Sequence, residues 1–424
     1  MRIVSPEEAV AGVRSRDQIY VQCAAATPEV LLRALVARAS ELERVSMVHL
    51  HIEGPGPHLA PEMAPHFRHR ALFIGPNARR AVNEGRADFV PVFLSDVPDL
   101  FLSGSLPLDH VFVNATPPDA HGFCSLGTSV EAMHAAIKAA KTVVVQFNHA
   151  MPRTLGESFI HVSQIDLAVE VDEPIHEVPR PQIGEIERRI GAFIADLVPD
   201  GATLQLGIGA IPSATAEFLG DKKDLGIHTE MFTDAVVDLV EAGVITGAAK
   251  VRNVGKLVAA FMMGTKRLYD FVHDNPMVEM RAVEFTNDTH VIRSFRHMTA
   301  INSAIEVDLS GQVVADSIGY RLYSGVGGQM DFMRGAALAP DGRAIIALPS
   351  AAGADHAISR ITPALQEGAG IVTTRAHVRT VVTEYGVAEL WGRSLRERAK
   401  ALIAVAHPDH RDRLEHEARR HYEL

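Results

Sequence analysis

Short apolar runs alternate with helical patterns along this chain, and this alternation constrains its fold more than any other feature. The runs at 110–115 (HVFVNA) and 142–147 (TVVVQF) are largely apolar at both odd and even positions. That pattern is typical of strands buried on both faces in a parallel sheet covered by helices. Intervening segments such as 129–141 carry apolar residues at helical spacing. The chain is therefore expected to adopt an α/β fold with open, mostly parallel sheets.

The same reading predicts the position of most other elements. A helix is expected to begin after Thr27-Pro28, with the Thr27 hydroxyl as its cap, and another covers 186–197. The charged C-terminal segment predicts surface helices. Further strands are expected at 47–52, 71–75, 88–93, 202–206, 257–263, 344–349, 370–374 and 380–385.

Two domains are expected from the length of 424 residues, since domains usually hold roughly 100–200 residues. The segment 171–183 carries three prolines and several charges, which interrupt the regular pattern. We place the first domain at 1–180 and the second at 184–424. A long surface loop at 171–183 is the alternative.

Composition excludes several classes of function. A formal net charge of −11 and a pI near 6.0 argue against a nucleic-acid-binding face. No secretory signal and no apolar run of about 18 residues occurs, so a soluble cytoplasmic protein without a membrane segment is expected. Cys23 and Cys124 do not form a disulfide framework, and Cys124 is expected to be a small buried residue. The 21 histidines complete no metal-binding motif, so we expect scattered histidines and no metal site.

Three motifs are candidates for a ligand site. Gly207-Ile208-Gly209 lies between an expected strand and an expected helix, where free amides attract an anion. It lacks the third glycine of a dinucleotide fingerprint, and a plain connecting turn is the alternative. Glu230 follows a strand-like segment and precedes a helix, as a residue on the carboxyl edge of a sheet would. Taken alone, it could equally be a solvated or ion-paired glutamate.

The third motif is the glycine cluster Gly325, Gly327 and Gly328 in the segment SGVGGQ. Such a cluster indicates unusual backbone conformations or a backbone that approaches a ligand, and a tight loop is the alternative. Glu306 and Asp308 share one face of an expected strand that ends in a turn. We interpret this acid pair as structural because no partner motif accompanies it.

These motifs occur together with several others and in one order along the chain. In this combination the chain resembles the acetyl-CoA hydrolase/transferase family. It is most similar to the 4-hydroxybutyrate, or butyrate–acetate type, CoA-transferases of that family. The stretches that carry the resemblance are AATPEVLLRAL, ATPPDAHGFCSLGTSVEA, MPRTLGESFIHVSQID, LQLGIGAIPSA, LGIHTEMFTD, INSAIEVDLSGQV, YSGVGGQMDFMRGA, VVTEYGVAEL and AHPDHR.

The resemblance implies two α/β domains of the CoA-transferase type with the active site in a cleft between them. It implies that Glu230 is the catalytic glutamate, with the amides of Ile208 and Gly328 as oxyanion donors. Substrate and coenzyme A contacts are implied for Gly207, Gly209, Asn287, Gly325, Gly327 and Glu384.

The implied reaction moves coenzyme A from a short-chain acyl-CoA to a free carboxylic acid through a glutamyl-CoA thioester. Acetyl-, butyryl- and 4-hydroxybutyryl-CoA are the expected donors, and coenzyme A is a substrate, so no cofactor is expected. Glu230 must be ionised to attack, which an ordinary glutamate pKa would ensure near neutral pH. A homo-oligomer, dimer or tetramer, is expected by analogy. The alternatives are an acyl-CoA hydrolase that uses the same glutamate and a non-catalytic protein that senses coenzyme A or a metabolite.

Overall fold

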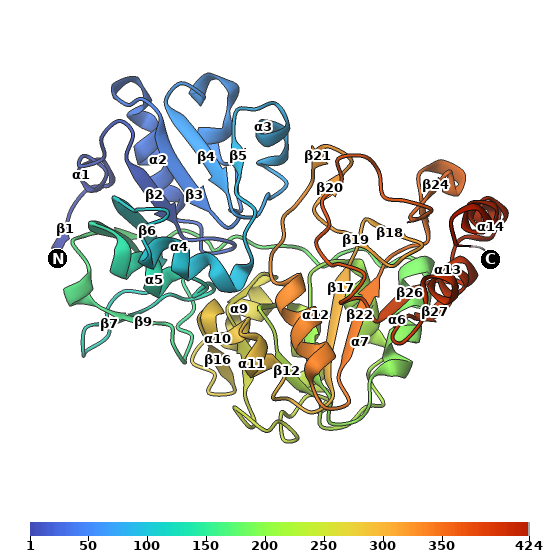
Figure 1. The fold of residues 1–424 in the computed structure, drawn as a ribbon. Coiled ribbons are helices and arrows are strands. Elements are labelled where there is room, and N and C mark those ends of the chain that lie inside the picture. The colour runs from blue at the N-terminus through green and yellow to red at the C-terminus, as the bar shows by residue number, and fades with distance from the viewer. Residues whose placement is uncertain (423–424) are drawn as a thin grey trace. The chain divides into compact units, whose positions relative to one another are not determined.

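A computed structural model describes residues 1–422 and divides the chain into two compact units (Figure 1). The first unit contains residues 1–179, 258–286 and 322–327. The second contains residues 180–257, 287–321 and the chain from 328 onward. Neither unit is therefore one uninterrupted stretch of chain.

The first unit is built on an eight-stranded sheet in which all neighbouring strands are parallel. Its strand order is β1 (Arg2–Ile3), β10 (Leu167–Val171), β8 (Thr142–Asn148), β6 (His110–Ala115), β2 (Gln18–Val21), β3 (Val45–His49), β4 (Phe67–Ala71) and β5 (Asp88–Phe89). Its helices are α1 (Pro6–Ala9), α2 (Glu29–Ala37), α3 (Arg79–Asn83), α4 (Val97–Leu102), α5 (Met133–Ala139), α9 (Lys266–Val272) and α10 (Val283–Thr286).

The second unit contains a sheet that is parallel apart from its last strand. Within this unit the strand order runs β12 (Gly226–His228), β11 (Thr203–Leu206), β17 (Met298–Ser303), β22 (Arg343–Ala347), β26 (Thr380–Thr383) and the antiparallel β27 (Gly386–Glu389). The helices are α6 (Glu185–Leu197), α7 (Ala210–Glu217), α8 (Asp234–Glu241), α11 (Thr289–Ile292), α12 (Gln329–Leu338), α13 (Leu395–Ala404) and α14 (Pro408–Tyr422). Helix α6 packs on α7, and α12 packs on β17 and β22.

Shorter strands complete the two units. They are β7 (Phe123–Ser125), β9 (Phe159–His161), β13 (Met231–Phe232), β14 (Leu257–Ala259), β15 (Phe261–Met262), β16 (Val278–Met280), β18 (Glu306–Asp308), β19 (Val313–Val314), β20 (Ser317–Ile318), β21 (Arg321–Leu322), β23 (Ala351–Ala352), β24 (Ile358–Ser359) and β25 (Ile361–Thr362).

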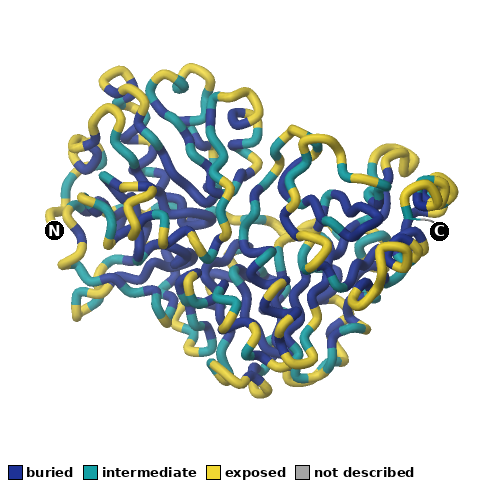
Figure 2. Tube along the Cα trace, in the orientation of Figure 1, coloured by how far each residue is buried: buried dark blue, intermediate teal, exposed yellow. Residues whose placement is uncertain are grey.

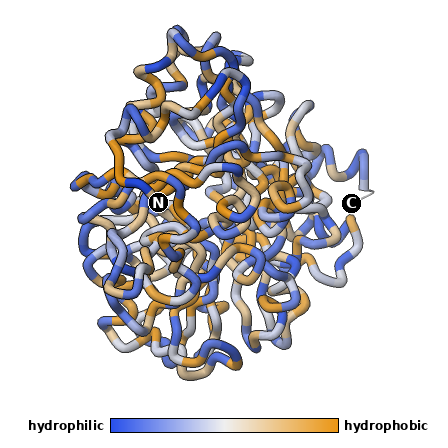
Figure 3. Tube along the Cα trace, turned by 90° about the vertical axis from the view of Figure 1, so that its left-hand side faces the viewer, coloured by the Kyte–Doolittle hydropathy of each residue, from blue (hydrophilic) through white to orange (hydrophobic). Residues whose placement is uncertain are grey.

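Burial explains why the predicted fold class is confirmed. Every residue of β6 is buried, and β8 is buried at every position after Thr142. Figure 2 shows buried chain in dark blue through the middle of each unit and exposed loops in yellow at its margin. The predicted helix at 186–197 is α6, which turns Ile190 and Ile194 into the core. Residues near the C-terminus form the expected charged helices, drawn mostly in blue and pale shades in Figure 3.

Three local predictions are wrong. The strand expected at 71–75 ends where that segment begins, because β4 covers Phe67–Ala71. Segment 370–374 is not a strand; Thr373 forms only an isolated bridge with Val313. Thr27 does not cap α2, because its hydroxyl donates to the Ala24 carbonyl and accepts from the Glu53 amide. The threonine instead fixes the turn that leads from β2 into the helix.

Candidate active site

Glu230 lies two residues beyond β12 and directly before the short strand β13, which precedes α8. The carboxyl ends of parallel strands are where ligands bind in open α/β sheets. The neighbouring Thr229 is buried, and its hydroxyl lies 3.1 Å from the Leu206 carbonyl oxygen and 2.9 Å from that of Met231. These contacts fix the loop to the end of β11, so the direction of the Glu230 side chain is set by the sheet.

The Glu230 carboxylate meets two hydrogen-bond donors from distant parts of the sequence. Asn287, fully buried between α10 and α11, donates from Nδ2 to Glu230 Oε2 at 3.1 Å. The backbone N–H of Gly328, the cap residue of α12, donates to the same carboxylate. Asn287 Nδ2 also donates to Asp331 Oδ2 at 3.1 Å, so Asp331 holds the amide that orients the glutamate.

Gly328 is the position where the backbone comes closest to this carboxylate. A Cβ atom built there would collide with Glu230 Oε2 and with Asn287 Nδ2. Only glycine therefore allows the first amide of α12 to face the carboxylate. This amide is also favoured as an anion donor by its place at a helix N-terminus.

The surroundings raise the pKa of Glu230 to about 7. Burial of the carboxyl group is the largest cause and is assisted by the negative charge of Asp331, whereas the hydrogen bonds from Asn287 and Gly328 act in the opposite direction. The expectation of an ordinary pKa is wrong, because the sequence does not reveal burial or the nearby Asp331.

The loop Gly207-Ile208-Gly209 connects β11 directly to α7, as predicted. Gly209 adopts a φ of 117°, which side-chain-bearing residues rarely adopt. No heavy atom lies within 4 Å of a Cβ built on Gly207 or Gly209, and Ile208 is 53% exposed. The backbone of this loop is thus open, and its roles toward a ligand stay predictions.

Gly325 and Gly327 belong to the first unit, where their surroundings explain why they are glycines. A Cβ on Gly325 would lie 2.9 Å from a Phe73 ring carbon, and Gly327 has a φ of 57°. The Gly327 carbonyl accepts from the Leu94 amide at 3.1 Å. Close backbone packing accounts for both residues, and their predicted substrate contacts stay predictions.

Glu384 follows β26 and is buried. Both of its oxygens are taken by Ser350, whose amide donates at 2.9 Å and whose hydroxyl donates at 2.6 Å. Strand β26 is separated from β12 by β11, β17 and β22 in the sheet order. Glu384 therefore orders the end of β22, and its predicted role toward a substrate stays a prediction. Glu306 is structural as expected, since it accepts from Thr362 and from the Gln366 amide.

Asp331 carries no signal in the sequence that marks it as part of the site. It lies three residues after Gly328 in the first turn of α12, where an acidic residue stabilises a helix and attracts no notice. Its burial and its contact with Asn287 distinguish it, and neither can be inferred without the fold.

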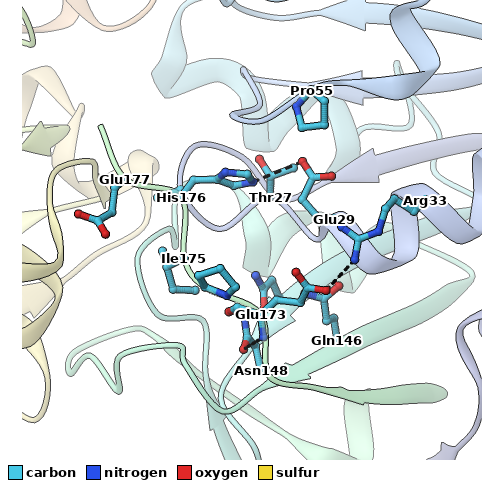
Figure 4. Close-up of a pocket in the computed structure, with 13 residues that line it drawn as sticks. Thr27, Glu29, Arg33, Pro55, Gln146, Asn148, Glu173, Ile175, His176 and Glu177 are labelled. Atoms are coloured by element: carbon cyan, nitrogen blue, oxygen red, sulfur yellow. Dashed lines mark hydrogen bonds and ion pairs between the residues drawn. The ribbon is translucent and has the colours of Figure 1, made fainter. Parts of the chain in front are cut away.

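A polar pocket of about 320 Å³ lies in the first unit (Figure 4). Its wall includes residues from the last part of strands β6 and β8 and residues that follow β2 and β10, and so lies at the carboxyl edge of that parallel sheet. His176 and Arg33 each approach a glutamate, with His176 Nε2 3.3 Å from Glu29 and Arg33 2.7 Å from Glu173 (Figure 4). Part of its wall comes from the stretch AATPEVLLRAL, which carries the family resemblance, but that stretch alone did not indicate a pocket.

No helix in the described part of the chain has the length and apolar character needed to cross a lipid bilayer.

Comparison with known proteins places the chain in a family. Residues 1–179 match the acetyl-CoA hydrolase/transferase N-terminal domain, and residues 264–418 match the C-terminal domain of the same family. The 4-hydroxybutyrate coenzyme A transferase of Clostridium kluyveri is 48% identical, over 99% of this chain and 98% of the relative. A succinyl-CoA:acetate/propanoyl-CoA:succinate CoA transferase of Fasciola hepatica is also 48% identical, over 96% of this chain and 86% of its own.

The solved structures agree with this placement. The crystal structure of a 4-hydroxybutyrate CoA-transferase from Porphyromonas gingivalis superposes with a TM-score of 0.86 at 40% identity, covering 99% of this chain and 97% of that one. RipA from Yersinia pestis gives a TM-score of 0.94 at 33% identity, covering 100% and 98%. The chain belongs to the acetyl-CoA hydrolase/transferase family.

Proposed function

We propose that this protein is an acyl-CoA:carboxylate CoA-transferase that works through a covalent intermediate on Glu230. The single observation that carries the proposal is the Glu230 carboxylate held by the Asn287 amide and the Gly328 N–H. Relatives named as CoA-transferases for 4-hydroxybutyrate, succinate and butyrate support a short-chain acid as the substrate class.

In the first step, a Glu230 oxygen attacks the thioester carbonyl carbon, and the C–S bond breaks. This gives an acyl-glutamyl anhydride and coenzyme A thiolate. The thiolate then attacks the glutamyl carbonyl, which forms the glutamyl-CoA thioester and releases the first acid as its carboxylate. A second carboxylate reverses these steps and leaves with coenzyme A, so the kinetics are ping-pong.

Each attack places negative charge on a carbonyl oxygen. Once Glu230 has been acylated, the Gly328 N–H and the Asn287 amide are positioned to stabilise that charge. One such donor typically contributes about 10²–10³ in rate.

The test is to trap the intermediate. The protein is incubated with butyryl-CoA, treated with borohydride, and digested for mass spectrometry, with a second sample that also contains acetate. We expect reduction of the Glu230 side chain to an alcohol only with acyl-CoA, and formation of acetyl-CoA only with acetate. Glu170→Gln, at an exposed position on β10, is the matched control and should label and turn over normally.

Other results have distinct meanings. Loss of butyryl-CoA at the same rate without acetate would identify an acyl-CoA hydrolase that uses the same glutamate. Binding of coenzyme A without label or turnover, over a series of short acids, would support a sensing role. Labelling of another residue would overturn the assignment of Glu230.

A further inference from the structure

Three histidines that are scattered in the sequence come together inside the first unit. His49 is the last residue of β3, His69 lies in the adjacent strand β4, and His58 lies in the short 3-10 helix Pro57–Leu59 between them. Their exposed fractions are 0%, 3% and 3%. One ring nitrogen of each lies within 4.8 Å of one on each of the others. The expectation of scattered histidines is wrong for these three, because β3 and β4 pair in parallel and the 3-10 helix folds over them.

Most of the ring nitrogens in this cluster lack a protein partner. His58 Nε2 and His69 Nδ1 lie 3.1 Å apart, but His49 Nδ1, His49 Nε2, His58 Nδ1 and His69 Nε2 have no hydrogen bond. A buried polar atom without a partner typically costs about 1–3 kcal/mol, so such atoms are uncommon. No carboxylate or hydroxyl is paired with these four nitrogens. The cluster therefore offers several nitrogen lone pairs to a ligand that needs them.

We propose that His49, His58 and His69 bind one divalent first-row transition-metal ion, with zinc as the reference ion. Three imidazole nitrogens suit zinc, cobalt, nickel or copper and do not suit magnesium or calcium, which prefer oxygen ligands. The fourth coordination position is left to a solvent molecule or another small ligand.

The ring nitrogens, one from each histidine, lie within 4.8 Å of one another and must move closer together to share one ion. Two nitrogens that share a tetrahedral zinc at about 2.0–2.1 Å are roughly 3.3 Å apart, close to the 3.1 Å between His58 and His69. The rings are nearly parallel, with interplanar angles of 19–23° and centroids 4.8–5.4 Å apart. Rotation of the rings about χ2, which is a broad torsion in histidine, can aim the lone pairs at one point.

The site would be structural. It would join β3, β4 and the 3-10 helix, which are separated by up to 20 residues in the sequence (49 to 69). Glu230 and the residues that contact its carboxylate belong to the other unit. The metal is therefore expected to stabilise the fold and not to enter the reaction.

The test uses the full-length protein after removal of metals with a chelator. One equivalent of Zn²⁺ is added, the protein is passed through a desalting column, and bound zinc is measured by mass spectrometry. We expect about one zinc per chain and a higher Tm, and the same sample loaded with Co²⁺ should show visible absorption of a tetrahedral site. His58→Phe, which retains an aromatic ring, should weaken zinc binding at least about 100-fold.

The matched control is His410→Ala. His356, His407 and His410 form a second, more exposed histidine group in the second unit, with ring centroids 4.6 and 5.9 Å apart. Zinc binding should be unchanged in this variant. Three results would each overturn the proposal. They are loss of zinc binding in His410→Ala, zinc binding in His58→Phe equal to that of the wild type, and less than about one zinc per chain in the wild type.

A further measurement covers the case in which His58→Phe does not fold. Wild-type crystals grown with one equivalent of zinc should show an anomalous peak between the three rings at the zinc absorption edge. A peak elsewhere, or none, would also overturn the proposal.

Discussion

The sheets of the two units share one strand order, and their carboxyl edges differ. In the first unit the central strand β2 has β3 on one side and β6, β8 and β10, in that order, on the other. In the second unit the central strand β11 has β12 on one side and β17, β22 and β26 on the other. The outer strand is parallel in the first unit and an antiparallel hairpin partner in the second. Topology alone therefore does not decide which edge carries the reactive group.

Two glutamates make the difference concrete. Glu131 in the first unit and Glu230 in the second both have a pKa raised to about 7, in each case chiefly by burial. Glu131 is fully buried and accepts hydrogen bonds from the Tyr20 hydroxyl at 2.9 Å and from the Ala132 amide. Glu230 is only partly buried and lies beside a backbone N–H and an open glycine loop on the next strand. A perturbed pKa marks a reactive carboxylate only when a substrate can reach it.

The largest expected effect is a difference in kcat between variants of these two glutamates. Glu230→Gln should lower kcat by at least about 10³-fold, because the nucleophile is lost. Glu131→Gln should retain kcat within about threefold. Steady-state transfer assays check both, with circular dichroism as the control for folding. Equal losses would show that the contrast between the two carboxyl groups is mistaken.

Alanine substitutions at the adjacent glycines Gly327, in the first unit, and Gly328, in the second, compare the two units with one added methyl group. Gly328→Ala places a Cβ against the Glu230 carboxylate and should lower kcat about 10²–10³-fold. Gly327→Ala should instead cost about 1–2 kcal/mol of stability, because its φ of 57° is left-handed. Transfer assays and urea unfolding distinguish these outcomes. A stable, active Gly328→Ala would remove the N–H of that residue from the mechanism.

Glu131 should also make stability depend on pH. Its folded pKa of about 7 lies above an unfolded value near 4.3, so the folded state binds the proton more tightly. The stability from this protonation is complete below about pH 4 and is lost as the pH rises through 7. Glu131→Gln should therefore gain roughly 2 kcal/mol relative to the wild type between pH 5 and pH 8. Urea unfolding at both pH values measures this gain, and a constant difference would contradict it.

The smallest expected effect is a shift in the pH dependence of transfer. Because Glu230 must be ionised to attack, kcat/KM should rise with pH around 7. Asp331→Asn removes a negative charge, so the pKa of Glu230 falls. The ratio of kcat/KM at pH 6 to its value at high pH should then be about threefold larger than in the wild type. Asn287→Leu removes a hydrogen bond that lowers the pKa of Glu230, so the rise of kcat/KM with pH should move to higher pH. Shifts in one common direction would contradict these assigned causes.

Local pattern predicted much of the fold and the position of the candidate nucleophile. Strand β6 lies at the predicted residues 110–115, because a strand buried on both faces leaves an unbroken apolar run. Glu230 was found because a strand–loop–helix pattern surrounds it, and the glycine loop was found for the same reason. The segment 370–374 also has a strand-like sequence and still forms no strand, since it pairs through only one isolated bridge.

What sequence reasoning missed depends on contacts between distant residues. Asp331 reaches Asn287 across 44 positions, and the pKa of Glu230 is raised by burial and by the negative charge of Asp331. The histidine cluster likewise requires the pairing of β3 with β4 before its members become neighbours. Gly325 packs against the Phe73 ring, about 250 positions away in the sequence; this contact explains the glycine and does not test its predicted role toward a substrate.

The interleaved composition of the two units has a consequence for synthesis on the ribosome. The first unit needs residues 258–286 and 322–327, which are made long after its sheet. Until Gly327 has left the exit tunnel, the Leu94 amide lacks the carbonyl that it bonds in the finished protein. The first unit therefore cannot complete its fold until much of the second unit has been synthesised. A gene that ends near codon 180 would encode an N-terminal piece that lacks residues 258–286 and 322–327 of its own unit.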